Sequence, residues 1–127
     1  MAKVVIRKAE LDYVLNSPSG IVGRYLAKKG KEVEIAAKSQ VGVRTGALRA
    51  SIHMRHLRDS RRQYVMVGSR LNYALMHHEG TKPHIIAANN AKALRFVKSG
   101  AIIYAHSVMH PGTKANRYLS DSLKRVL

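Results

Sequence analysis

The sequence contains no cysteine and no tryptophan, and it has one phenylalanine and three prolines among 127 residues. Without cysteine the chain can form neither a disulfide nor a thiolate metal site, and it has no thiol nucleophile. No apolar run approaches the roughly 20 residues that span a bilayer. The apolar stretch among the first residues is too short for a secretory signal. These absences predict a protein that is made in a cytoplasm, is no membrane protein and carries out no redox chemistry.

Acidic residues are also scarce, with seven Asp and Glu against 23 Lys and Arg. No neighbouring pair of carboxylates suggests a glycosidase, and a Mg²⁺ nuclease usually needs several convergent acids. The sequence has no P-loop and no dinucleotide-binding glycine pattern. We therefore expect that the chain is not an enzyme, has no catalytic residues and binds no cofactor.

The positive charge is the dominant feature of what is present. The formal net charge is +16 and the isoelectric point is about 10.7. Most of the excess lies in residues 35–127, which contain only three of the seven acidic residues. A folded domain with this charge repels itself, so its partner is expected to be a polyanion: nucleic acid, an acidic membrane or an acidic protein. The alternative is a basic surface that serves solubility alone.

Seven histidines are the remaining candidates for metal ligands. Three converging imidazoles can bind zinc, but the sequence lacks a His-Glu-x-x-His pattern. His77 and His78 are adjacent, so on a helix they point in different directions. We expect structural or surface roles for the histidines and no metal site.

The first 40 residues are expected to be helical. A short helix over Ala9–Leu15 is followed by a Pro- and Gly-containing break and then by a helix to about Gln40. Gly23 and Gly30 each cost about 1 kcal/mol relative to Ala in a helix interior, so a close packing contact would be needed to explain them.

The remainder alternates short strands and helices. Thr45 is expected to cap a short helix over Gly46–Ser51, and Tyr73–His78 is expected to form another. The expected strands are Ile52–Arg58, Gln63–Ser69, His84–Ala88, Leu94–Val97 and Ala101–Val108, the last two forming a second hairpin. After Asn116 a final helix is expected to bury Leu119, Leu123 and Val126 or Leu127 as a stripe. The pattern predicts one α+β domain over residues 1–127, with N-terminal helices, a central antiparallel sheet of two hairpins and a C-terminal helix.

A repeated pentad is the most informative local feature. Residues 78–82 and 110–114 share the form His-x-Gly-Thr-Lys. The glycine permits a backbone conformation closed to other residues, and the threonine can bond nearby amides. Such a segment is favoured as a structural turn, while successive amides beside a lysine could alternatively hold a phosphate.

Arginines gather around the first expected hairpin, with Asp59 as the only acid nearby. They could form a solvated face, but their number favours contact with phosphates that is blind to base sequence. The candidate DNA-facing residues are Arg55, Arg58, Arg61, Arg62 and Arg70.

The order of motifs over residues 41–127 resembles the neck and tail-completion (head–tail connector) proteins of long-tailed phages. Residues 43–52, Val-Arg-Thr-Gly-Ala-Leu-Arg-Ala-Ser-Ile, are similar to a TG-x-L-R-x-S-I segment of that family. Tyr73-Ala74, a first Gly-Thr, Pro83-His84-Ile85-Ile86, a hairpin and a second Gly-Thr before the last helix follow in the family's order. The motif residues that the resemblance places at turns or at an oligomer interface are Thr45, Gly46, Leu48, Arg49, Ser51, Gly80, Thr81, Pro83, His84, His110, Pro111, Gly112, Thr113 and Asn116.

The resemblance implies a minor structural component of the virion, made in the cytoplasm of the bacterial host. Such a protein forms a ring, commonly six-fold, between the head and the tail tube, contacts other neck proteins and the tail tube or terminator, and lets the genome pass through its lumen. The tail terminator proper is the nearest alternative within the phage hypothesis. A free nucleic-acid-binding protein and a histidine-dependent metal hydrolase are the alternatives from other classes.

Overall fold

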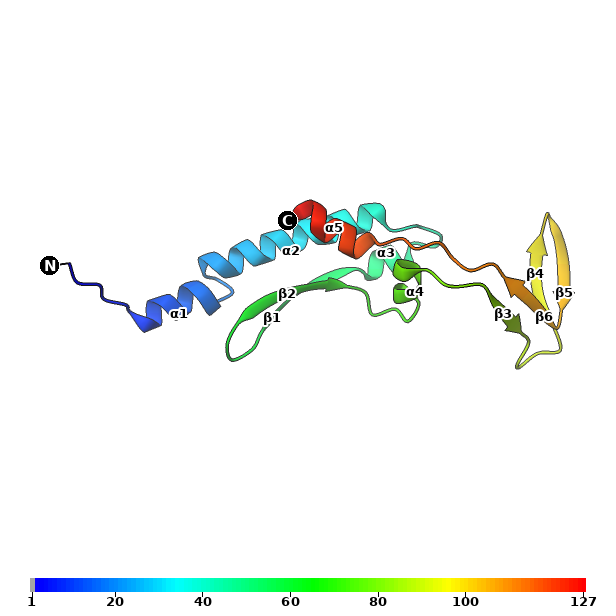
Figure 1. Ribbon diagram of the computed structural model, residues 1–127, viewed down its shortest axis with the longest axis horizontal. Helices are drawn as coiled ribbons and strands as arrows, with labels where there is room; N and C mark the ends of the chain where they lie inside the picture. Colours follow the sequence, from blue (N-terminus) through cyan, green and yellow to red (C-terminus); the bar gives the residue numbers. More distant parts are fainter. Residues whose placement is uncertain (1) are drawn as a thin grey trace. The chain divides into compact units, whose positions relative to one another are not determined.

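The computed structural model describes residues 2–127 and has the expected α+β composition, with helices at both ends and antiparallel strands between them (Figure 1). The contacts within the chain group its residues into two compact units. The first unit comprises residues up to Ala74 together with Arg117–Leu127, and the second comprises Leu75–Asn116.

The first unit begins with helices α1 (Lys8–Asn16) and α2 (Ile21–Gln40), as expected from the sequence. The break at Pro18 separates them. Gly30 of α2 is buried, and a Cβ atom there would lie 2.8 Å from Cγ of Met54 and closer still to Val65. The absence of a side chain at Gly30 therefore lets the segments that carry Met54 and Val65 approach the helix closely. This is the close packing contact that was expected to explain the glycine.

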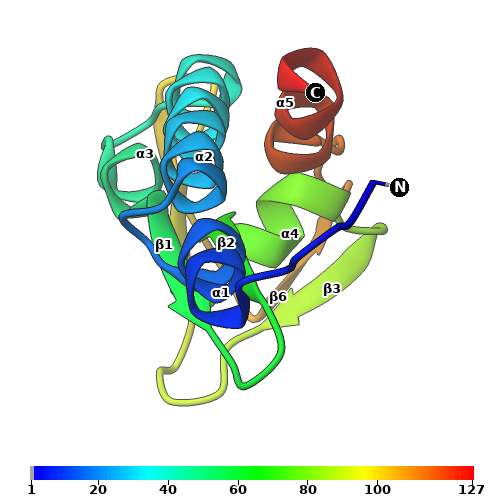
Figure 2. The ribbon, with the colours of Figure 1, turned by 90° about the vertical axis from the view of Figure 1, so that its left-hand side faces the viewer.

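Strands β1 (His53–Arg58) and β2 (Gln63–Gly68) form the antiparallel hairpin that packs against α2. Met54 pairs with Val67 and His56 with Val65, so these four side chains share the face toward α2. Helix α5 (Tyr118–Val126) lies beside α2 in both views (Figures 1 and 2). The core of this unit collects Ala37 of α2, Leu48 of the short helix α3 (Ala47–Ser51), Ala74 at the start of α4 (Ala74–Glu79) and Tyr118 of α5, together with Val41 and Ile52, which directly follow α2 and α3.

Two local expectations about the first unit are wrong. Thr45 does not cap α3: Gly46 holds that position with φ +84°, and only a 3.4 Å bond joins the Ala47 amide to Thr45 Oγ1. In α5 the buried residues are Tyr118 and Ser122, with Leu119 packed against the core, whereas Leu123 and Leu127 are exposed. The small serine allows α5 to approach its neighbours closely, which a stripe of leucines would prevent.

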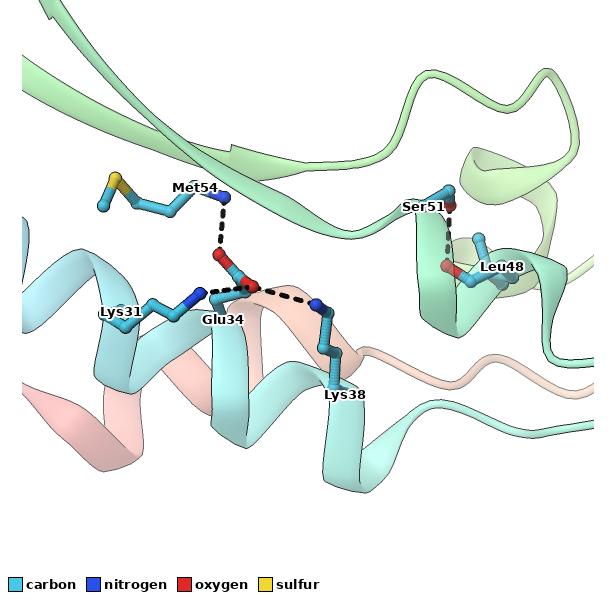
Figure 3. Close-up of polar contacts among 6 residues, drawn as sticks. All are labelled: Lys31, Glu34, Lys38, Leu48, Ser51 and Met54. Atoms are coloured by element: carbon cyan, nitrogen blue, oxygen red, sulfur yellow. Dashed lines mark hydrogen bonds and ion pairs between the residues drawn. The ribbon is translucent and has the colours of Figure 1, made fainter.

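A buried carboxylate joins α2 to β1 (Figure 3). Glu34 accepts hydrogen bonds from Nζ of Lys31 and Nζ of Lys38, each at 2.9 Å, and from the backbone N–H of Met54, also at 2.9 Å. The hydrogen bond from Lys38, aided by those from Lys31 and Met54, lowers the pKa of Glu34 from 4.5 to about 2 despite its burial. The carboxylate thus satisfies an amide of a strand that pairs on one side only.

The second unit contains α4 from Leu75 onward (α4 spans Ala74–Glu79) and two separate two-stranded sheets. Strand β4 (Leu94–Lys98) pairs with β5 (Ala101–Ala105), which confirms the second hairpin. The expected long strand Ala101–Val108 is divided at His106, and its second part, β6 (Ser107–His110), pairs instead with β3 (His84–Ala87). The hairpins are therefore members of different two-stranded sheets.

Candidate functional site

The two His-x-Gly-Thr-Lys pentads bind each other. Thr81 and Thr113 form an antiparallel bridge in which each backbone N–H donates to the other residue's carbonyl at 3.0 Å. The hydroxyl of Thr81 donates to Oγ1 of Thr113 at 3.2 Å and accepts from the Thr113 amide at 3.0 Å. We call this arrangement the pentad bridge. The repeat in the sequence thus corresponds to a paired element in space.

The two glycines make the close approach possible. Gly80 has φ +76° and Gly112 has φ +87°, a region that other residues seldom adopt. A Cβ atom on Gly112 would overlap the carbonyl oxygen of Thr81, and one on Gly80 would overlap the carbonyl oxygen of Thr113. Each pentad therefore excludes a side chain at its glycine because the other pentad occupies that space.

Histidines extend the bridge by one further pair. His84 and His110 are directly opposite each other in β3 and β6, with ring centroids 5.0 Å apart. Nδ1 of His84 lies 2.9 Å from the carbonyl oxygen of Lys82, so Nδ1 carries the proton. Nδ1 of His110 accepts the N–H of Gly112 at 3.1 Å, so in this ring Nε2 carries the proton. The backbone of the pentads thus fixes the two imidazoles in opposite tautomers.

Three of the backbone amides that a phosphate nest could use are already bonded within the structure. Those of Thr81 and Thr113 bond across the bridge, and that of Gly112 bonds His110. The geometry therefore favours the structural turn over the anion site. Asn116, at the end of the second unit, donates its N–H to the carbonyl of His77 at 3.1 Å and so ties the chain back to α4. Lys82, Pro83 and Pro111 are exposed.

The Thr-Gly-x-Leu-Arg-x-Ser segment lies in the first unit and serves its packing. Leu48 is buried in the core, whereas Thr45 and Arg49 are exposed. Ser51 Oγ donates to the carbonyl of Leu48 at 2.6 Å and lies 2.6 Å from Ser69 Oγ. Because Ser51 has only one hydroxyl proton, Ser69 must donate to Ser51. These bonds fix the end of α3 to the end of the hairpin.

The five candidate arginines are spread along the β1–β2 hairpin. Arg55 lies on the face away from α2, while Arg58 belongs to the opposite face at the strand's end. Arg62 in the turn pairs with Asp59 at 3.3 Å and lies over the Tyr64 ring at 5.5 Å. Arg61 is in the same turn, and Arg70 follows the other end of the hairpin. The turn gathers Arg58, Arg61 and Arg62, and Arg70 is remote from it.

Asp59 organises that turn. The backbone amides of Arg61 and Arg62 donate to its Oδ1 at 2.8 and 2.9 Å. These amides, together with the Arg62 guanidinium, lower the pKa of the Asp59 carboxyl. The acid therefore shapes the basic turn and neutralises only part of its charge.

Three buried polar residues, Glu34, Gln63 and Ser122, were not among the residues singled out from the sequence. The Gln63 side chain donates to the carbonyl of Leu15 at 2.6 Å and contacts Nε2 of His56 at 2.9 Å. For Glu34 a signal was available, because it directly follows Val33 and precedes Ala37 by one turn on the apolar side of the helix.

The second unit exposes an unusual amount of apolar surface. None of the residues from Leu75 to Asn116 is buried. The exposed large apolar side chains of this unit are Leu75, Met76, Ile85, Ile86, Val97, Ile102, Tyr104 and Met109. Apolar side chains that are exposed together on one surface are typical of sites that a partner covers.

Across residues 2–127, no helix has the length and apolar character to cross a membrane, and no three His, Asp or Glu side chains gather as a metal-binding group. No family model, curated protein or solved structure matches the chain.

Proposed function

We propose that the chain is a structural virion protein of the phage head-to-tail junction. It forms a homo-oligomeric ring, six-fold by analogy with the family it resembles, which completes the tail and joins it to the DNA-filled head. Its role is assembly rather than catalysis. The ring contacts other neck proteins and the tail tube or terminator, and the genome passes through its lumen.

The observation that carries this proposal is the exposed apolar surface of the second unit. Two-stranded sheets are marginally stable in water, and both sheets of this unit are two-stranded. A neighbouring subunit that covers β4–β5 and the segment around Ile85 and Ile86 would remove this surface from water. In a ring each subunit contacts its neighbours through two different, complementary surfaces.

The net charge of +16 supports the proposal that the genome passes through the lumen of the ring. A subunit near a DNA channel needs positive charge but no base-reading side chains. The turn that holds Arg58, Arg61 and Arg62 is the best candidate for the part of the subunit that faces the genome.

Size-exclusion chromatography with light scattering tests whether the chain forms a ring. Salt-titrated binding to duplex DNA tests the alternative, a free nucleic-acid-binding protein. A defined oligomer with weak affinity for DNA is the expected result. A monomer at every protein concentration that binds DNA tightly, with a steep salt dependence, would instead favour the free nucleic-acid-binding protein, whose supporting observation is the same arginine turn. Gly112→Val is expected to prevent ring formation, and its normal assembly would count against a role for the pentad bridge.

A further inference from the structure

Hairpin β4–β5 has one face whose apolar side chains are largely exposed in the part of the chain that the structure describes. Arg95 pairs with Tyr104 and Val97 with Ile102, so these four side chains share a face. Val97 is 65%, Ile102 51% and Tyr104 67% exposed. We call these four residues the hairpin face. The turn residues Ser99 and Gly100 both have positive φ, as in the tight type I′ turn, so the register of the hairpin is well specified.

Helix α1 is the second element whose apolar side chains are only partly covered. It packs against α2, but none of its nine residues is buried. Leu11 and Leu15 are four residues apart and therefore lie on one side of the helix, each 46% exposed. Asp12 lies beside Leu15 on the same helix. We call Leu11, Asp12 and Leu15 the α1 face.

We propose that the hairpin face of one subunit docks on the α1 face of a second copy of this chain. This inference rests on the proposed ring and identifies the two surfaces that close it. Both surfaces are apolar, they differ from each other, and their charges are complementary: the hairpin offers Arg95 and the helix offers Asp12.

The charges also give the direction of docking. Lys8 precedes Asp12 by one turn on the same side of α1, so Arg95 is placed toward the C-terminal half of the helix, near Asp12 and Leu15, rather than near Lys8. The apolar contacts supply the affinity, while an exposed ion pair of this kind mainly fixes the orientation.

The absence of cysteine permits a direct test by disulfide formation. Leu15→Cys and Ile102→Cys are prepared as separate single variants of the full chain and mixed under mild oxidation. A covalent dimer is expected in the mixture and not in either variant alone, because a disulfide requires Cα atoms within about 7 Å. Tyr13→Cys, on the other side of α1, and Ala101→Cys, on the other face of the hairpin, are the matched controls and are expected to give no dimer.

A charge exchange provides the second measurement. Arg95→Glu is expected to weaken self-association about threefold, and Arg95→Glu with Asp12→Arg to restore it, on the scale of an exposed ion pair. Arg95→Glu with Glu10→Arg is the control, because Glu10 lies on the other side of Leu11 and should restore nothing. Ile102→Asp is expected to weaken association about a hundredfold, because it places an unpaired charge in the contact.

Several outcomes would overturn the proposal. A covalent dimer of Ile102→Cys alone would mean that two hairpins meet each other. The chain that carries both Leu15→Cys and Ile102→Cys is a further test. If its disulfide forms only within one monomer, the hairpin of the same chain covers α1. If the chain is a defined oligomer but the mixture gives no dimer, the docking proposal fails while the ring stands; if the chain is a monomer at every concentration, both fail.

Discussion

Replacing Glu34 by glutamine is expected to destabilise the first unit strongly. The glutamine oxygen can still accept the Met54 amide, but the attraction of Lys38 and Lys31 for a carboxylate is lost. The pKa of Glu34 falls from 4.5 to about 2, and about 1.4 kcal/mol accompanies each pKa unit. Since the side chain is only 6% exposed, little of this is screened by water. Because the glutamine keeps the hydrogen bond from Met54, the expected loss is smaller than the full effect, about 2–3 kcal/mol in the free energy of unfolding at pH 7.

The pH dependence has a definite sign. The pKa of Glu34 is lower in the folded chain than in the unfolded chain, so on acidification the unfolded chain takes up the proton first. The contribution of Glu34 is therefore complete above about pH 4.5 and is lost as the pH falls toward about 2. In Glu34→Gln this loss is absent, so the stabilities of the variant and the wild type should converge as the pH falls through that range.

Urea denaturation followed by circular dichroism at several pH values between 7 and 2 measures both effects. Glu32→Gln is the matched control: Glu32 pairs with Lys29 at 3.0 Å, at a partly exposed position of the same helix. It should lose less than about 0.5 kcal/mol. The reasoning is refuted if Glu34→Gln and Glu32→Gln cost the same at pH 7, or if the difference between wild type and Glu34→Gln does not change with pH.

Three further substitutions test the packing. Gly112→Ala should open the pentad bridge and abolish hydrogen-exchange protection of its threonine amides, whereas Gly100→Ala, with positive φ but open space around it, should leave those amides protected. Gly30→Ala should lower the free energy of unfolding by about 1–2 kcal/mol in urea denaturation, because the added methyl overlaps the hairpin's side chains and outweighs the gain in helix propensity. Ser122→Ala should be neutral or raise the melting temperature slightly, because Ser122 Oγ is buried without a partner among the described residues; a large drop would mean that the hydroxyl is bonded in solution.

The elements of the first unit could be predicted because their local signals agree. The Pro-Gly break, the helical periodicity of α2 and the polar turn at Asp59 each specify structure over a few residues, and all three are confirmed. The burial pattern of α5 could not be predicted, since a serine reads as polar and only the close approach of neighbouring helices makes it a core residue. For Glu34 the position on the apolar side of α2 was a signal, but its hydrogen bond from the backbone amide of Met54, 20 residues along the chain, could not be predicted.

The second unit shows where reading along the chain fails. The run Ala101–Val108 is uniformly strand-like, so nothing local marks the division at His106 after which β6 leaves β5 for β3. The pentad repeat was visible in the sequence, but the pairing of the two copies was not: two similar short segments can be independent turns or can bind each other. Only the three-dimensional structure shows that each glycine makes room for the other copy. The assembly role of these residues remains a prediction.

The pentad bridge joins the two ends of an excursion of the chain. From Lys82 the backbone runs through β3, β4, β5 and β6 and returns at Gly112, next to where it departed. The segment between these points begins and ends at the same place in the structure. A change in the length of this segment therefore need not move the residues that precede Thr81 or follow Thr113. We therefore expect that insertions or deletions between Lys82 and Gly112 leave the pairing of Thr81 with Thr113 intact.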